Sequence, residues 1–187
     1  MRIRSILTVL LLIIASTPYI RTTLAQDEIV LSAFATATPT IDGDLSSFPG
    51  EWTDTIAQPF ELTWQEKDHN ATLYVKNDLA TMYITVVIEL ENYSDLDALL
   101  ISFDLDNDGQ TWREGDDTDA LLATPGGLAM DGYFDPAKEF PARDDLDSGT
   151  NDIEAAVGHT NPAGVGNYTF EFSHPLCSGD TGTCRKP

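Results

Sequence analysis

The sequence predicts an all-β protein in which antiparallel strands form two sheets packed face to face, a β-sandwich. Short segments alternate apolar and polar residues, and clusters of Gly, Pro, Asn and Asp separate these segments. No window of a dozen residues shows the apolar spacing of three and four that an amphipathic helix needs. Because each such strand has one apolar face, packing one sheet on another is the expected way to bury those faces.

The clearest strand is "TMYITVVIEL", in which alternate residues share a face. The residues on the predicted core face are Met82, Ile84, Val86, Ile88 and Leu90. A second strand, "TLYVKND", begins at Thr72, and Asn77 and Asp78 follow it directly. The Asn-Asp pair with Leu79 and Ala80 predicts the turn of a β-hairpin between the two strands.

Further strands follow from the same alternation. They are "FELTWQ" near residue 60, "LLISFDL" at 99–105, "NDIEAAVGHT" from 151 and "NYTFEFS" from 167, with "IVLSAFA" from 29 as an edge strand. The acidic and Gly-rich stretch 110–131 and the segment "FPARDDLDSGTND" from Phe140 are expected to be loops at the ends of the sandwich.

The N-terminus predicts a secretory signal peptide. Arg2 and Arg4 precede an apolar run over 6–14, and Thr23-Leu24-Ala25 supplies small residues before a cleavage site. An uncleaved anchor is the alternative, but the run is short for a hydrocarbon core about 30 Å thick. We therefore expect cleavage after Ala25, a single domain over 26–187, and a secreted or cell-surface location.

The charge is strongly acidic. The chain has 31 acidic and 10 basic residues, a formal net charge of −21. Removing residues 1–25 takes away three arginines and no acid, so the mature chain carries 7 − 31 = −24. Such a surface repels nucleic acid and anionic membranes, so neither is expected as a partner. Cations are the natural counter-charge, although acidity that only maintains solubility is the simpler alternative.

Only two cysteines occur, Cys177 and Cys184. In an exported protein the pair predicts a small local disulfide. A metal role for it is disfavoured because no Cys-x-x-Cys or Cys/His array accompanies it.

Four segments in order resemble family nine carbohydrate-binding modules and the related DOMON-like domains. They are "IDGDLSSFPGEW", "TLYVKNDLATMYITVVIE", "FDLDNDG" with "GDD", and "YTFEFSHPL", and they extend over about residues 29–176. The resemblance implies a jelly-roll-like or immunoglobulin-like sandwich that is secreted, non-catalytic, and binds a polysaccharide or glycan or, in some branches, haem. Those modules have at least one more strand after the last segment, whereas only eleven residues follow Leu176 here. The resemblance therefore allows a sandwich without a final strand, which would leave one sheet edge open to pair with another chain. The alternative function is then a structural or adhesive domain that binds other cell-surface proteins.

The stretch "FDLDNDGQTWREGDD" predicts a structural calcium site. Asp104, Asp106 and Asp108 alternate before Gly109, like the first half of a calcium-binding loop. An EF-hand is excluded because its twelfth position here is Gly115 and no helix flanks it. Asp116, Asp117 or Asp119 are expected to complete the oxygen ligands. The seven carboxylates between residues 104 and 119 would repel one another by about 1 kcal/mol per close pair even in water. A solvated turn that caps its own backbone is the alternative.

Glycan binding needs flat aromatic platforms and planar polar groups. Trp112 in the acidic loop is the first candidate, Trp64 could face either side of its strand, and Trp52 is expected to be structural. Further candidates are the aromatic residues Tyr133 and Tyr93 and the polar residues Asn92, Arg113 and Asp131.

Two other functions are weighed. Non-covalent haem would need an axial ligand from His69, His159, His174, Met82 or Met130, and no Cys-x-x-Cys-His motif exists for covalent haem. The chain also has neither a Gly-x-Ser-x-Gly nor a His-Glu-x-x-His motif, so we do not expect an enzyme. Glu171, between two phenylalanines, is expected to be either a strand-surface residue or a network residue rather than a general base.

Overall fold

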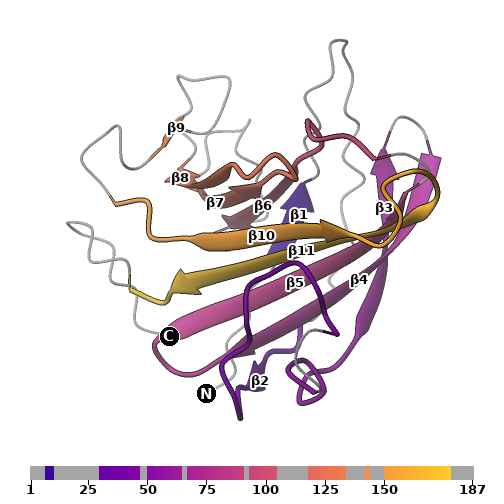
Figure 1. The fold of residues 1–187 in the computed structure, drawn as a ribbon. Helices are drawn as coiled ribbons and strands as arrows, with labels where there is room; N and C mark the ends of the chain where they lie inside the picture. Colours follow the sequence, from indigo (N-terminus) through magenta and orange to yellow (C-terminus); the bar gives the residue numbers. More distant parts are fainter. Residues whose placement is uncertain are drawn as a thin grey trace.

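The computed structural model describes residues 7–10, 30–46, 50–64, 67–90, 93–104, 118–133, 142–143 and 150–177. Within them the chain contains no helix, and its strands form two sheets packed as the predicted β-sandwich (Figure 1). The five-stranded sheet runs β1 (Leu7–Leu10), β6 (Leu99–Asp104), β7 (Thr118–Ala123), β8 (Ala129–Tyr133), β9 (Ala142–Arg143). The six-stranded sheet runs β10 (Glu154–His159), β11 (Gly166–Pro175), β5 (Thr81–Leu90), β4 (Lys67–Asn77), β2 (Ala33–Phe34), with β3 (Gln58–Trp64) also on β4. All strand pairs are antiparallel except β2 with β4.

The main core lies between the two sheets. It contains the predicted face of β5, and the most deeply buried members are Ile84, Val86, Ile88, Tyr168, Phe170, Phe172, Leu99, Ile101, Leu121 and Ala123. Each of these is at most 2% exposed. Burying one of these Val, Leu, Ile or Phe side chains contributes about 1.5–3 kcal/mol relative to exposure, so this layer is the main stabilising feature of the fold.

The predicted hairpin between β4 and β5 is confirmed. Oδ1 of Asp78 accepts hydrogen bonds from the backbone N–H groups of Ala80 and Thr81 at 3.1 and 2.8 Å. Leu79 has φ = 74°, a left-handed conformation that costs a non-glycine residue energy. The Asp78 carboxylate therefore stabilises a turn in which the apolar Leu79 is exposed.

The expectation of one long loop over 110–131 is wrong, because β7 and β8 form a hairpin there. The register pairs Leu121 with Ile101 of β6, and both are fully buried, so apolar packing outweighs the acidic composition around it. Gly127, with φ = 88°, allows the tight turn between the two strands. Within the second expected loop, β9 pairs briefly with β8.

A second apolar layer covers the outer face of the six-stranded sheet. Residues 35–46 and 50–52 lie on this face, and Ala35 and Trp52 pack against Tyr83 of β5. Backbone contact is close where the first of these segments meets β10: a Cβ at Gly158 would lie 2.2 Å from the carbonyl oxygen of Gly43. Glycine is therefore required at position 158 for the segment to lie flat on the sheet.

β2 lies at one end of the described six-stranded order, within the segment from 29 that the sequence predicts as an edge strand. β10 lies at the other end, and β11 is paired on both sides, by β10 and β5. β1 comes from the predicted signal segment and pairs with β6, so the predicted cleavage would remove that strand. Among the described residues, no helix is long and apolar enough to cross a membrane. Signal cleavage and secretion stay predictions.

Candidate functional site

Most of the predicted calcium ligands lie outside the described residues, namely Asp106, Asp108, Asp116 and Asp117. Asp104 ends β6, where it pairs with Thr118, and Asp119 of β7 pairs with Phe103. The strand pairing thus holds the two ends of the acidic segment side by side. The calcium site itself stays a prediction.

The predicted glycan-binding residues are not brought together among the described residues. Trp64 ends β3 in the six-stranded sheet, whereas Tyr133 ends β8 in the other sheet. Trp112, Arg113 and Asn92 lie outside the described residues. The structural role predicted for Trp52 is confirmed, because its ring is 6% exposed and part of the outer apolar layer.

An open cavity of about 380 Å³ lies on the outer face of the six-stranded sheet. The lining residues are Leu45, Gly50, Trp52, Thr53, Thr55, Ala57 and Tyr74. The Trp52 and Tyr74 rings are tilted by 54° with their centroids 6.4 Å apart, so the lining combines aromatic and apolar surface with two threonine hydroxyls. Among the residues that the structure describes, no Asp, Glu or His lines this cavity. The sequence could not indicate it, because residues from two separate segments form it.

Glu171 holds the floor of this cavity in place. Its Oε2 accepts hydrogen bonds from the backbone N–H groups of Asp42 and Gly43 at 3.0 and 2.7 Å, and its Oε1 accepts one from Nε1 of Trp52 at 3.1 Å. Burial, and to a lesser degree the nearby Glu51, raises the pKa of Glu171 despite these bonds. The side chain is fully buried, so Glu171 is a network residue, one of the two roles that the sequence predicts.

A buried lysine completes the network behind the cavity. Nζ of Lys76 donates to the carbonyl oxygens of Ala37 and Glu51 and to Oδ1 of Asp54, and it lies 5.1 Å from the centroid of the Trp52 ring. Although burial acts to raise it, hydrogen bonds from Thr36 and Lys76 hold the pKa of Asp54 below its ordinary value. Together these bonds fix segment 36–54 on the sheet.

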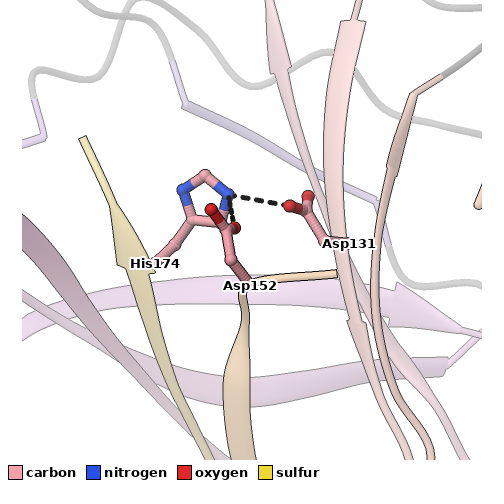
Figure 2. Close-up of side chains that lie close together, drawn as sticks. All are labelled: Asp131, Asp152 and His174. Carbon is pink, nitrogen blue, oxygen red and sulfur yellow. Dashed lines mark hydrogen bonds and ion pairs between the residues drawn. The ribbon is translucent and has the colours of Figure 1, made fainter. Parts of the chain in front are cut away.

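A second cluster lies in the space between the sheets. Asp131 of β8 is opposite Leu121 in the register and faces the core with it, and His174 continues the buried alternation of Phe170 and Phe172 in β11. Asp152 lies in the segment that leads into β10. Nε2 of His174 is 3.0 Å from Oδ2 of Asp131 and 3.3 Å from Oδ1 of Asp152, as Figure 2 shows. The three donor atoms all lie within 4.8 Å of one another, a donor set that could hold a metal ion.

Asn151 positions this cluster. Its Oδ1 accepts a hydrogen bond from the backbone N–H of Asp131 at 2.7 Å, and its Nδ2 donates to the carbonyl oxygen of Ala129 at 3.4 Å. The segment before β10 is thereby fastened to β8. Sequence reasoning considered Asp131 only as a glycan contact and His174 only as a haem ligand, and it missed Asp152, because no local motif links the three.

Three of the other haem-ligand candidates, His159, Met82 and Met130, are packed against the rest of the fold. Nδ1 of His159 accepts a hydrogen bond from the backbone N–H of Asn161, and its ring packs edge-on against Tyr168 with centroids 4.6 Å apart. Met82 packs against the main core, and Met130 is 8% exposed. None of the candidate haem ligands is among the described residues that line the cavity on the outer face.

Of the two cysteines predicted to form a disulfide, the structure describes Cys177. No cysteine among the described residues is free, and Cys177 takes part in a disulfide. Cys184 lies outside the described residues, so the pairing of the two stays a prediction.

Neither a protein-family model nor a curated protein sequence matches the chain. The resemblance to family nine carbohydrate-binding modules therefore depends on the order of its short motifs.

Proposed function

We propose that the protein is a secreted, non-catalytic carbohydrate-binding module whose acidic loop binds calcium. The observation that carries the proposal is the cavity on the outer face, where Tyr74 and Trp52 lie beside the hydroxyls of Thr53 and Thr55. A pyranose ring is recognised by an aromatic surface for its C–H groups and by polar atoms for its hydroxyls. The cavity volume of about 380 Å³ is within the range of small-ligand sites.

The hydroxyls in the lining are oriented and keep accepting capacity. Oγ1 of Thr53 donates to the carbonyl oxygen of Gly50, and Oγ1 of Thr55 donates to that of Trp52, both at 2.8 Å. Each oxygen can therefore accept a hydrogen bond from a sugar hydroxyl. Because the network of Glu171 and Lys76 fixes the floor, little ordering would be required on binding.

The lining also favours binding over hydrolysis. A glycosidase needs two carboxyl groups about 5 to 10 Å apart across the scissile bond. Glu171, which holds Trp52 of the lining, and the neighbouring Glu51 are 0% and 3% exposed, and Glu171 is occupied by three donors. A buried, fully bonded carboxylate supports the cavity rather than acting on a ligand in it.

Binding is tested with a panel of soluble polysaccharides by isothermal titration calorimetry. We expect Tyr74→Ala to abolish the uptake seen with the wild type, Tyr74→Phe to retain it, and the control Phe34→Ala, at an exposed aromatic residue on β2 outside the lining, to leave it unchanged. Thermal melts of each variant check that the fold persists. Loss of binding in Trp112→Ala alone would move the site to the acidic loop. Absence of binding to every polysaccharide would refute the proposal and favour the adhesive alternative.

Calcium is tested separately by melting the protein in chelator and in calcium. A bound ion stabilises the folded state by mass action, so the melting temperature should rise with calcium concentration. Replacing Asp106 and Asp108 together by Asn should remove this dependence. An identical melting temperature in both conditions would leave the acidic segment as a solvated turn.

A further inference from the structure

We propose that Asp131, Asp152 and His174 bind a divalent transition-metal ion such as Zn²⁺ between the two sheets. The three residues lie in three separate segments, on β8, before β10 and on β11. This site is distinct from the acidic loop and from the outer cavity, because it lies on the inner faces of both sheets. It therefore does not depend on the proposed glycan function.

The distances suit a single ion. Ligand atoms at about 2.0–2.2 Å from a tetrahedral zinc ion lie roughly 3.3 Å from one another. Nε2 of His174 is 3.0 and 3.3 Å from the carboxylate oxygens of Asp131 and Asp152. Figure 2 shows both carboxylates directed at this one nitrogen. Two of the three donor separations are thus already about those that an ion would impose, and the third is no more than 4.8 Å.

One buried acceptor of the cluster, Oδ1 of Asp131, has no hydrogen-bond partner among the described residues. The side chain of Asp131 is 1% exposed. One N–H at Nε2 of His174 would have to serve two carboxylates at once. A buried acceptor without a partner costs about 1–3 kcal/mol, and more when it is charged. An ion in the cluster would supply the missing partner.

The charges of the three side chains are compatible with a metal ion, because a divalent ion balances two carboxylates beside a neutral imidazole. The side chain of Asp152 is 17% exposed, so the cluster is reachable from solvent on one side.

The donor set selects the class of metal. Imidazole nitrogen suits zinc, copper, nickel and cobalt, whereas calcium takes six to eight oxygen ligands. Three protein ligands leave a fourth position for water, as in open zinc sites. An ion here would link β8 of one sheet to β11 of the other, and would stabilise the sandwich at this end.

The test uses Co²⁺ as a spectroscopic probe on chelator-treated full-length protein, followed by Zn²⁺ competition. We expect visible absorption bands of tetrahedral cobalt that Zn²⁺ abolishes and excess Ca²⁺ does not. His174→Ala and Asp152→Asn should each weaken Co²⁺ binding by more than the ~10–100-fold that loss of a second-shell partner typically costs. If His174→Ala does not fold, Asp152→Asn still tests whether the cluster binds the ion. The matched control His69→Ala, on β4 and outside the cluster, should bind as the wild type does.

Two results would overturn the inference. The first is a wild-type protein that shows no cobalt bands and no shift in melting temperature with Zn²⁺. The second is cobalt binding that survives in His174→Ala and Asp152→Asn but disappears when Asp106 and Asp108 are replaced by Asn, because the ion would then belong to the acidic loop.

Discussion

Replacing the buried Lys76 by Met should destabilise the protein strongly while preserving side-chain volume. The ammonium group donates to two backbone carbonyl oxygens and to Oδ1 of Asp54, and the side chain is fully buried. Each carbonyl left without a donor costs about 1–1.5 kcal/mol, within the range for unsatisfied buried groups. Loss of the contact with the Trp52 ring adds about 0.5–1 kcal/mol.

Asp54 adds little to this sum. Its carboxylate keeps two hydrogen bonds from Thr36, at 2.8 and 2.7 Å, and its side chain is 16% exposed. We therefore expect a loss of about 3 kcal/mol in the free energy of unfolding. For a chain of this size that corresponds to a decrease of about 6–12 °C in melting temperature.

Equilibrium urea unfolding measures the effect of Lys76→Met, with the exposed Lys67→Met on the same strand as the control. The control should change stability by no more than about 0.5 kcal/mol, the usual range for surface positions. A double-mutant cycle with Asp54→Asn separates the ion pair from the carbonyl bonds. If Lys76→Met lowers the free energy of unfolding by less than about 1 kcal/mol, Lys76 does not hold Ala37, Glu51 and Asp54 against the sheet as we conclude.

Three further outcomes follow from single contacts. Tyr168→Phe removes the hydroxyl that donates to the buried Asp97, and should lower the free energy of unfolding in urea by about 1.5–3 kcal/mol. An unchanged free energy of unfolding would contradict this hydrogen bond. Gly158→Ala places a Cβ 2.2 Å from the carbonyl oxygen of Gly43 and should destabilise by about 1–3 kcal/mol; an unchanged urea midpoint would contradict the close packing. Burial raises the pKa of Glu171 above 4.5, so its stabilising contribution is present below that pH and is lost as pH rises through the folded-state value. Wild-type stability should therefore fall relative to Glu171→Gln as pH rises from 4.5, and parallel pH profiles of the two proteins would argue against this.

The fold could be predicted from local pattern where that pattern is strong. The alternation of apolar and polar residues in 81–90 and in 167–173 predicts strands with one buried face, and the structure places both segments in central strands. The β7–β8 hairpin was missed because acidic residues surround its few apolar positions. Leu121 and Leu122 are nevertheless buried on opposite faces of that sheet, which no local window reveals.

The candidate sites depend on register between distant segments, and this explains why sequence reasoning did not find them. Asp131 and His174 approach because β8 and β11 face each other across the core, 43 positions apart. The cavity likewise needs segment 50–57 to lie over Tyr74 of β4. What the sequence could indicate was the chemistry of single residues, such as a structural Trp52 and a networked Glu171.

β11 shows how one strand serves both faces of its sheet. Successive residues of a strand point to opposite sides, so Glu171 faces the outer segment 35–52 while His174, three positions later, faces the space between the sheets. A polar residue within an apolar strand is tolerated only where a partner reaches it. For Glu171 the partners are three N–H donors supplied by the covering segment. For His174 the partners are the carboxylates of Asp131 and Asp152, and together the three side chains form the donor set at which we propose that an ion binds.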